Sequence, residues 1–395
     1  MYRKIMSFLE AWKDSEHRKP LILQGARQVG KTYSILEFGR THYENVAYFN
    51  FETNPKLNET FAENISPDYL IPILSHIAGQ TIVREKTLIV FDEVQLCERA
   101  LTSLKYFCED APDYHIIVAG SLLGVAVNRA KFSFPVGKVD MKTLYPMDME
   151  EFMVACGESA LVEQIKKCFA EDTPLPSALH DAAMQLYRQY LIVGGMPECV
   201  MQFVETKDYI LVRHTQDTIL ASYLNDMSKY NNLNEIKKTR LAYDNITVQL
   251  SKKNTRFQYK LIKKGGRASE FENAIEWLCL SGIVSQVYKV EQIKKPLENY
   301  RDIDAFKIYV SDLGLLCAKK DLAANDILYM VEEINDFKGG MAENYVNVQL
   351  SINGYHTYYW ESERGAEIDF IIQRDGQLIP VSYTHLRAHE TSQDL

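Results

Sequence analysis

KPLILQGARQVGKTYSILEFGR, residues 19–40, holds three kinds of local sequence in a row. The apolar run LILQ is typical of a buried strand, a loop with two glycines follows, and TYSILEFG has the composition of a helix. The loop, GARQVGKT, fits the pattern G-x-x-x-x-G-K-[ST] at Gly25, Gly30, Lys31 and Thr32. Strand, glycine loop and helix in this order are the context in which that pattern binds phosphate groups.

Each residue type in this loop suits a bound chain of phosphates. Glycines let consecutive backbone N–H groups curve around the phosphates, and the positive end of the following helix points to the same place. We expect Lys31 to neutralise the β- and γ-phosphates and the hydroxyl of Thr32 to bind Mg²⁺. The alternative is a glycine turn between strand and helix that binds nothing. The predicted nucleotide-binding residues of the loop are Gly25, Ala26, Arg27, Gln28, Val29, Gly30, Lys31 and Thr32.

Two adjacent carboxylates end a second apolar run, in the stretch KTLIVFDEVQ at residues 86–95. The run predicts a strand buried on both faces, and open α/β sheets bind ligands beyond the carboxyl ends of such strands. We expect Asp92 to hold Mg²⁺, through water, and Glu93 to orient and polarise an attacking water. The alternative is an acidic strand end that faces solvent.

Two further strands complete this pattern. VAYFNFE at residues 46–52 and YHIIVAG at residues 114–120 are typical of strands, and Ser121 follows the second. Ser121 could contact the γ-phosphate from a neighbouring strand or cap the next helix, and one side chain can do both. Strands that alternate with helices predict an α/β fold, with a parallel sheet and helices on both faces.

Composition limits the class of protein. A chain of 395 residues suits roughly two to four domains. The net charge of −9 excludes a protein that is basic all over, so nucleic acid would have to bind a local patch. Seven cysteines without a CxxC pair favour reduced thiols in the cytoplasm over disulfides or zinc. No apolar run approaches the ~18 residues that cross a bilayer, so we predict a cytoplasmic protein without a membrane partner.

The series of motifs resembles a known group. GARQVGKT, LIVFDEVQ, AGSLLG, KFSFPVGKV and LYPMDMEEF, in this order, are similar to the AAA+-type prokaryotic ATPases with a restriction-endonuclease-like C-terminal domain, over residues 1–381. The resemblance implies ATP rather than GTP, a five-stranded core and Ser121 in the sensor position. Lys138 stands where related ATPases often carry an arginine near a subunit boundary. Arg27 and Arg129 are candidates for that arginine, or are solvated or phosphate-steering charges.

The middle of the chain is predicted to form a helical lid over residues 151–232 and a winged helix over residues 233–320. Gly194, Gly195 and Pro197 stand between helical stretches, which by itself indicates that one helix stops and another starts. The resemblance implies more, namely a proline that lies against the nucleotide base and reports its state to the lid. Helices followed by a β-ribbon suggest the winged helix.

A basic segment, residues 252–267, lies within the predicted winged helix. Several phosphate-neutralising side chains in one short segment are what a DNA-binding patch needs. The alternative is a solvated face of a packing domain, and Glu270, Glu272 and Glu276 just beyond the segment would repel phosphates. DNA is therefore one candidate partner. The basic residues are Lys252, Lys253, Arg256, Lys260, Lys263, Lys264 and Arg267.

The end of the chain, residues 321–381, resembles the PD-(D/E)xK nuclease core. Glu343 on a helix and Asp369 on a strand match its first two acidic positions, which hold a divalent metal in that core. The third element, E-x-K, should follow LIPV, where the chain has SYTHL. The tail VSYTHLRAHETSQDL is similar to translated sequencing adapter. We therefore expect that residues 382–395 are not native, that the true gene continues, and that this chain has no nuclease activity.

Two functions remain. The first is a Mg²⁺-dependent ATPase whose domain at residues 1–150 drives or switches the lid, winged helix and nuclease-like part. Its expected catalytic residues are Lys31, Glu93 and Ser121, and Pro197 is expected at the nucleotide. The alternative is a nucleic-acid-binding module in which ATP is a structural or regulatory ligand with little turnover. A homo-oligomer is a candidate assembly, because ATPases of this class often complete their site from a neighbouring subunit.

Overall fold

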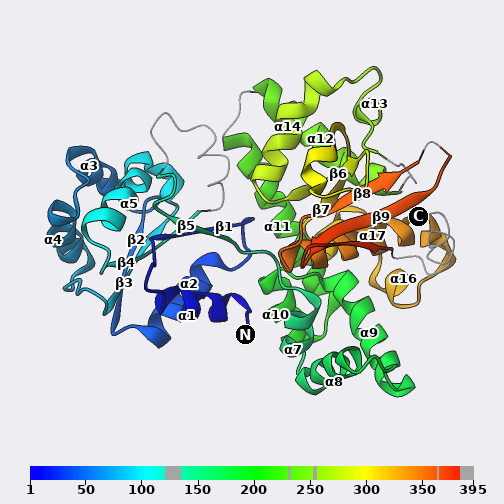
Figure 1. Ribbon diagram of the computed structural model, residues 1–395, viewed down its shortest axis with the longest axis horizontal. Helices are drawn as coiled ribbons and strands as arrows, with labels where there is room; N and C mark the ends of the chain where they lie inside the picture. Colours follow the sequence, from blue (N-terminus) through cyan, green and yellow to red (C-terminus); the bar gives the residue numbers. More distant parts are fainter. Residues whose placement is uncertain (121–134, 230–232, 252–255, 363, 383–395) are drawn as a thin grey trace. The chain divides into compact units, whose positions relative to one another are not determined.

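The computed structural model describes residues 1–120, 135–229, 233–251, 256–362 and 364–382 (Figure 1). The chain divides into two compact units, residues 1–145 and residues 146–395. In the described residues, each unit has a sheet of five strands. Within the same part of the chain, no helix is both long enough and apolar enough to cross a membrane.

The first unit alternates strands and helices. Its five strands are parallel and lie in the order β2-β3-β4-β1-β5, which confirms the predicted parallel sheet. Strand β1, before the glycine loop, is separated by β4 from β3, which ends in the two carboxylates. The elements are α1 (Ile5–Lys13), β1 (Leu21–Gln24), α2 (Lys31–His42), β2 (Asn45–Asn50), α3 (Lys56–Glu63), α4 (Pro67–Ala78), β3 (Thr87–Asp92), η1 (Val94–Leu96), α5 (Glu98–Asp110), β4 (His115–Ala119) and β5 (Asp140–Thr143).

Helices cover both faces of this sheet, because successive strand residues point to opposite sides. On one face, Ile89 and Phe91 of β3 pack in one core with apolar residues of α3, α4 and α5. On the other face, α2 comes so close that a Cβ on Gly39 would lie 3.1 Å from the Leu88 side chain. All six residues of β3 are buried, as expected for a strand of a parallel sheet covered on both sides.

Helix α1 is amphipathic and packs on the first unit with one side. Ile5, Leu9 and Trp12 are buried, and their spacing of four and three residues places them on one side of the helix. Trp12 Nε1 donates a hydrogen bond to the Lys19 carbonyl oxygen at 2.9 Å. The helix is therefore tied to the chain directly before β1.

The second unit begins with a run of helices. Asp148 caps α7 and forms a reciprocal capping box with Glu151. Gly194, with φ 74°, ends α9, and Pro197 is the first residue of α10. The helix break that the Gly-Gly-x-Pro pattern predicts is thus confirmed. The helices of this part are α7 (Met149–Ala155), α8 (Ser159–Ala170), α9 (Ser177–Val193), α10 (Pro197–Thr206), α11 (Tyr209–Lys229), α12 (Leu233–Ser251), α13 (Tyr259–Ile262) and α14 (Ala268–Leu280).

Strands from two predicted domains share one sheet in the second unit, in the order β10-β9-β8-β6-β7. Strand β6 pairs with β7 as an antiparallel ribbon and also pairs in parallel with β8. The boundary predicted at residue 320 therefore runs between strands of a single sheet. The elements are β6 (Val284–Val290), η2 (Leu297–Tyr300), β7 (Arg301–Val310), α15 (Leu313–Lys319), α16 (Ala324–Leu328), η3 (Glu332–Ile334), α17 (Asn335–Ile352), β8 (Tyr358–Glu361), β9 (Glu367–Arg374) and β10 (Gln377–Val381).

Helix α17 supports the edge strand β7 of this sheet. The buried Asn344 side chain accepts a hydrogen bond from Val310 N at 2.8 Å and donates one to Val310 O at 2.9 Å. At the opposite edge, Asp375 and Gly376 join β9 to β10 with φ values of 49° and 72°. Two successive residues with positive φ are typical of a tight Asp-Gly hairpin turn.

Candidate nucleotide-binding site

The glycine loop connects β1 to α2 in the first unit. Gly25 has φ 147°, and a Cβ at this position would lie 2.1 Å from the carbonyl oxygen of Leu144. Gly30 has φ 90° and stands directly before α2. Both positions need glycine, the first for space as well as conformation. The loop therefore packs against the segment that leaves β5 and brings its backbone to the start of α2.

Arg3 anchors this loop from the segment before α1, and the sequence analysis missed it. Its side chain is buried, and its guanidinium donates to the carbonyl oxygens of Val29 at 3.0 Å and Tyr145 at 2.8 Å. These two bonds join the glycine loop to the chain beyond β5. No local signal could have found this contact, because Tyr145 lies 142 residues away from Arg3.

Lys31 is buried at the base of the loop. Its ammonium group donates to the carbonyl oxygens of Gly25 at 2.9 Å and Ala26 at 2.8 Å. Burial lowers the pKa of Lys31 to about 8, although the charges of Glu93 and Asp92 act in the opposite direction. A phosphate placed beside this ammonium would restore its charge, since an anion favours the protonated form.

Asp92 is the point where the loop and strand β3 meet. Its Oδ2 accepts hydrogen bonds from the Thr32 hydroxyl at 2.9 Å and from the Tyr48 hydroxyl at 2.7 Å, and its Oδ1 accepts one from Glu93 N at 3.0 Å. Thr32 and Asp92 are 60 residues apart in sequence. Hydroxyl and carboxylate oxygens are ligand types that Mg²⁺ binds, so these residues fit the ion that the sequence predicts.

Glu93 follows Asp92 on a sharp turn of the backbone. Its φ of 52° is unusual for a residue with a side chain, and it redirects the chain from β3 into η1. Burial raises the pKa of the Glu93 carboxyl, as do the charges of Asp92 and Glu52, whereas the hydrogen bond from Gln95 lowers it. A carboxyl with a raised pKa is better suited to accept a proton from water than an ordinary one.

Two residues near the carboxylates escaped the sequence analysis. Tyr48 on β2 bonds to Asp92, and Gln95 Nε2 donates to Glu93 Oε2. Asn50 is the register partner of Asp92 in the parallel pair β2–β3 and donates to the Tyr48 hydroxyl at 3.2 Å. The alternation in VAYFNFE carried a signal, because Tyr48 and Asn50 are polar at a spacing of two and so lie on one face.

Several predicted residues are not brought into this site by the described structure. Ser121 and Arg129 lie outside the described residues. Lys138 forms an exposed ion pair with Glu109 at 2.9 Å. Pro197 belongs to the second unit, where its contact with a nucleotide stays a prediction.

The stretch that contains Pro197 is held by Asp312, a residue that no sequence pattern predicted. The buried Asp312 accepts hydrogen bonds from Gly195 N at 2.6 Å and from Leu315 N at 2.8 Å. A Cβ on Gly194 would lie 2.3 Å from Asp312 Oδ1. Burial raises the pKa of Asp312 to about 6, against the effect of the backbone donors. The carboxylate therefore joins the start of α15 to the break between α9 and α10.

A parallel sheet, a glycine loop after β1 and a hydroxyl–carboxylate pair between the start of α2 and the end of β3 are typical of a P-loop nucleotide-binding domain. Comparison with protein families agrees, because residues 17–153 match the family described as "AAA domain". The first unit therefore has an α/β P-loop fold, and residues 17–153 are similar to AAA domains. Two families described as "Domain of unknown function" match further on, DUF8612 over residues 184–326 and DUF4143 over residues 338–385.

Solved structures of low sequence identity are similar over most of the chain. A Walker-type ATPase of Pyrococcus abyssi is 13% identical, covers 81% of this chain and 95% of its own, and has a TM-score of 0.48. The ORC2 protein of Aeropyrum pernix is 12% identical, with 89% and 95% covered and a TM-score of 0.39. The Holliday junction branch migration motor RuvB of Thermotoga maritima is 14% identical, with 71% and 87% covered and a TM-score of 0.32. A comparison with curated proteins found no match.

Proposed function

We propose that this protein binds ATP and hydrolyses it with Mg²⁺ in its first unit. The observation that carries the proposal is the 2.9 Å hydrogen bond between Thr32 Oγ1 and Asp92 Oδ2. This bond brings a loop suited to phosphates and a strand end suited to a metal ion to one place. Lys31 and Glu93, which are also expected to act on the triphosphate, are neighbours of these two residues in sequence.

Each residue has a separate task in this proposal. Lys31 exchanges its two carbonyl partners for oxygens of the β- and γ-phosphates. Thr32 and Asp92 hold Mg²⁺, which when bound offsets the charge that develops on the phosphates. Glu93 accepts a proton from the water that attacks the γ-phosphorus, and Gln95 keeps its carboxylate in position. Ser121 is proposed to contact the γ-phosphate from the next strand.

ATP hydrolysis by two variants tests the proposal. Lys31→Ala should abolish measurable ATP binding and turnover, because a buried cation that faces the phosphates is lost. Lys86→Ala is the control, since Lys86 forms an exposed ion pair with Glu44 at 2.8 Å, and it should keep wild-type turnover. Full turnover by Lys31→Ala would refute the assignment of the site.

The nucleotide state is proposed to act on the second unit through the Gly-Gly-Met-Pro stretch. Asp312 fixes this stretch to α15, which directly follows strand β7, so a displacement at residues 194–197 would reach the second sheet. Pro197 is proposed to lie against the base. Pro197→Ala should then bind ATP several-fold more weakly while melting at the wild-type temperature. Unchanged ATP affinity would show that Pro197 does not contact the nucleotide.

Nucleic acid is the second candidate ligand, and one cavity supports it. Basic and aromatic side chains line a cavity of about 850 Å³ beside α13 and α14. Aromatic faces with nearby basic groups suit an unstacked base of a single strand. Lys252 and Lys253 of the predicted basic segment lie outside the described residues. The basic, aromatic and acidic residues of the lining include Arg256, Lys260, Arg267, Phe257, Tyr259, Tyr288, Phe306, Glu272, Glu276 and Asp304.

The charged residues around this cavity determine how strongly DNA binding should depend on salt. Three basic and three acidic residues face it, so binding should depend only weakly on salt, with a slope of about 2 or less in log–log form. Single-stranded DNA binding should be lost when Lys260 and Arg267 are changed to glutamate. Lys166→Glu is the control, because Lys166 pairs with Glu150 elsewhere in the unit. Unchanged binding by Lys260→Glu/Arg267→Glu would exclude this cavity.

A further inference from the structure

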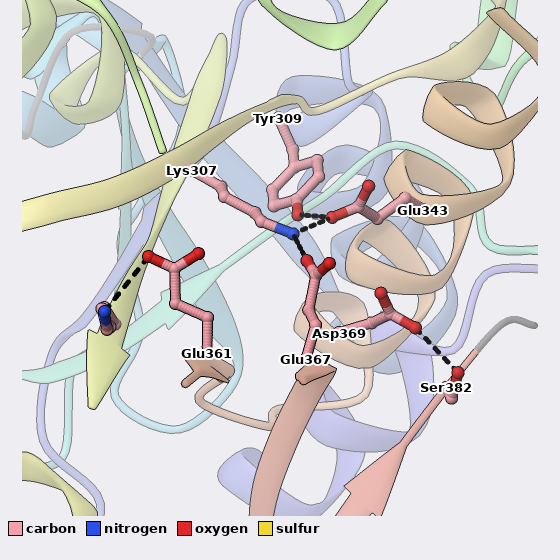
Figure 2. A network of polar contacts seen from close by, with 8 residues as sticks. Lys307, Tyr309, Glu343, Glu361, Glu367, Asp369 and Ser382 are labelled. Carbon is pink, nitrogen blue, oxygen red and sulfur yellow. Dashed lines mark hydrogen bonds and ion pairs between the residues drawn. The ribbon is translucent and has the colours of Figure 1, made fainter. Parts of the chain in front are cut away.

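Strand β7, strand β9 and helix α17 bring one lysine and three carboxylates together in the second unit (Figure 2). Lys307 on β7 is buried, and its ammonium donates to Glu343 Oε1 at 2.7 Å and to Glu367 Oε1 at 2.8 Å. The hydroxyl of Tyr309 donates to the same oxygen of Glu343 at 2.6 Å. The lysine therefore lies between two acids that come from different elements.

The third carboxylate belongs to Asp369, which stands two residues after Glu367 on β9 and so on the same face of the strand. Its Oδ2 accepts a hydrogen bond from the Ser382 hydroxyl at 2.8 Å. Figure 2 shows the Asp369 carboxylate turned toward Ser382, while Glu343 and Glu367 both point to Lys307. The three acids therefore do not converge on a common point.

The resemblance to a nuclease core implies a divalent metal held by Glu343 and Asp369, and the residues present do not fit that ion. The Lys307 ammonium already fills the space beside Glu343. Among the described residues, no group of three or more histidine, cysteine or acidic side chains is arranged to hold a metal.

Electrostatics favour a permanently charged Lys307. Burial on its own lowers the pKa of this lysine, but the charges of Glu343 and Glu367 outweigh burial and raise it above the usual value. The two carboxylates thus hold Lys307 in its charged form. Removal of one partner from a buried ion pair leaves the other charge uncompensated, which is strongly destabilising.

We propose that Lys307 is the built-in cation of this cluster, a side chain that takes the place of a divalent metal and joins β7 to β9 and α17. The cluster then needs no metal to be stable, and it does not bind one. This inference concerns the second unit alone and does not depend on ATP hydrolysis in the first.

A second lysine provides a matched control. Lys289 on β6 donates to Glu361 on β8 at 3.1 Å and so joins two strands of the sheet. Its side chain is partly buried. It meets one carboxylate in this ion pair, whereas Lys307 meets two. Loss of Lys289 should therefore not create a place for a divalent ion.

The test measures Mn²⁺ binding by electron paramagnetic resonance, together with the melting temperature, in the full chain without nucleotide. All samples carry Asp92→Asn, which removes the carboxylate proposed to hold the metal ion in the first unit. The otherwise unchanged chain should bind no Mn²⁺ in the second unit and melt at one temperature with or without Mn²⁺. Lys307→Met should melt lower by about 5 °C or more, gain Mn²⁺ binding that the unchanged chain lacks, and regain stability when Mn²⁺ is added. Lys289→Met should show no gain of Mn²⁺ binding.

Two results would overturn the proposal. One is stoichiometric Mn²⁺ binding by the chain that retains Lys307, lost on Glu343→Gln, because the cluster would then be a metal site in spite of the lysine. The other is a Lys307→Met variant with unchanged melting and no affinity for Mn²⁺. If Lys307→Met does not fold, the comparison of the Lys307 chain with its Glu343→Gln variant still decides the question.

Discussion

Burial lowers the pKa of Lys31, and this change affects how the residue binds a phosphate. With a pKa lowered to about 8, the unbound chain keeps the ammonium below that pH and loses it as the pH rises further. When a phosphate binds above pH 8, Lys31 must therefore take up a proton from solvent.

ADP affinity should fall with pH for this reason. We expect the dissociation constant to be flat between pH 6.5 and 7.5 and to rise by up to about tenfold per unit above pH 8. Calorimetry in buffers of different ionisation enthalpy should detect proton uptake on binding at pH 8.5. An unchanged dissociation constant up to pH 9.5 in the wild type would contradict the assigned role.

Substitution of Gln95 and substitution of Glu52 should shift the acid limb of the pH–rate profile in opposite directions. The hydrogen bond from Gln95 lowers the pKa of Glu93, and the charge of Glu52 raises it. Gln95→Leu should therefore move the acid limb of kcat to higher pH and reduce kcat several-fold, while Glu52→Gln should move the limb to lower pH. The measurement is kcat from pH 5 to 8 for the three proteins. Shifts in the same direction would show that Glu93 does not set this limb.

At the scale of elements, the segment that leads into helix α1 supports the candidate site. Arg3 in this segment donates hydrogen bonds to the glycine loop and to the chain beyond β5. Arg3→Met leaves two carbonyl oxygens without these donors and should lower the free energy of unfolding by about 2–4 kcal/mol. It should also weaken ADP binding, measured on the folded variant. Arg18→Met serves as control, since Arg18 bonds to Lys13 O and Pro112 O. Equal effects of the two substitutions on ADP binding would contradict the anchoring role.

Local patterns predicted the elements that depend on neighbouring residues. The helical spacing of Ile5, Leu9 and Trp12, the all-buried strand before Asp92 and the Asp375–Gly376 turn are each encoded within a few positions. Contacts between distant segments were not predictable in this way. The parallel pairing of β6 with β8 joins residues 288–289 to residues 358–359, and periodicity carries no information about such a partner.

The same distinction holds for the candidate site, where local motifs were predictable and long-range contacts were not. The residue types and spacing in GARQVGKT and in Asp92–Glu93 predicted the two halves, and the order of the strands brings the halves together. Arg3 and Asp312 escaped because a single polar residue has no spacing pattern, whereas Tyr48 carried a signal only through its spacing of two from Asn50. Their roles depend on register and long-range packing, which only the fold supplies.

At the scale of the whole molecule, the ATPase domain is proposed to assemble with other copies of the chain when ATP is bound. Glu93→Gln, which should hold ATP without hydrolysing it, should form a homo-oligomer with ATP and Mg²⁺ in size-exclusion chromatography with light scattering. Lys31→Ala should keep its nucleotide-free mass under the same conditions. A Glu93→Gln protein that remains monomeric with ATP at the highest concentration tested would refute nucleotide-driven assembly.

Single-turnover hydrolysis of ATP by Glu93→Gln tests the central claim most directly, because it separates binding from chemistry in the same protein. If Glu93 activates water at the site formed by Lys31, Thr32 and Asp92, the variant should bind ATP and Mg²⁺ with wild-type affinity and hydrolyse it at least about 100-fold more slowly. Hydrolysis by Glu93→Gln at the wild-type rate would contradict the account.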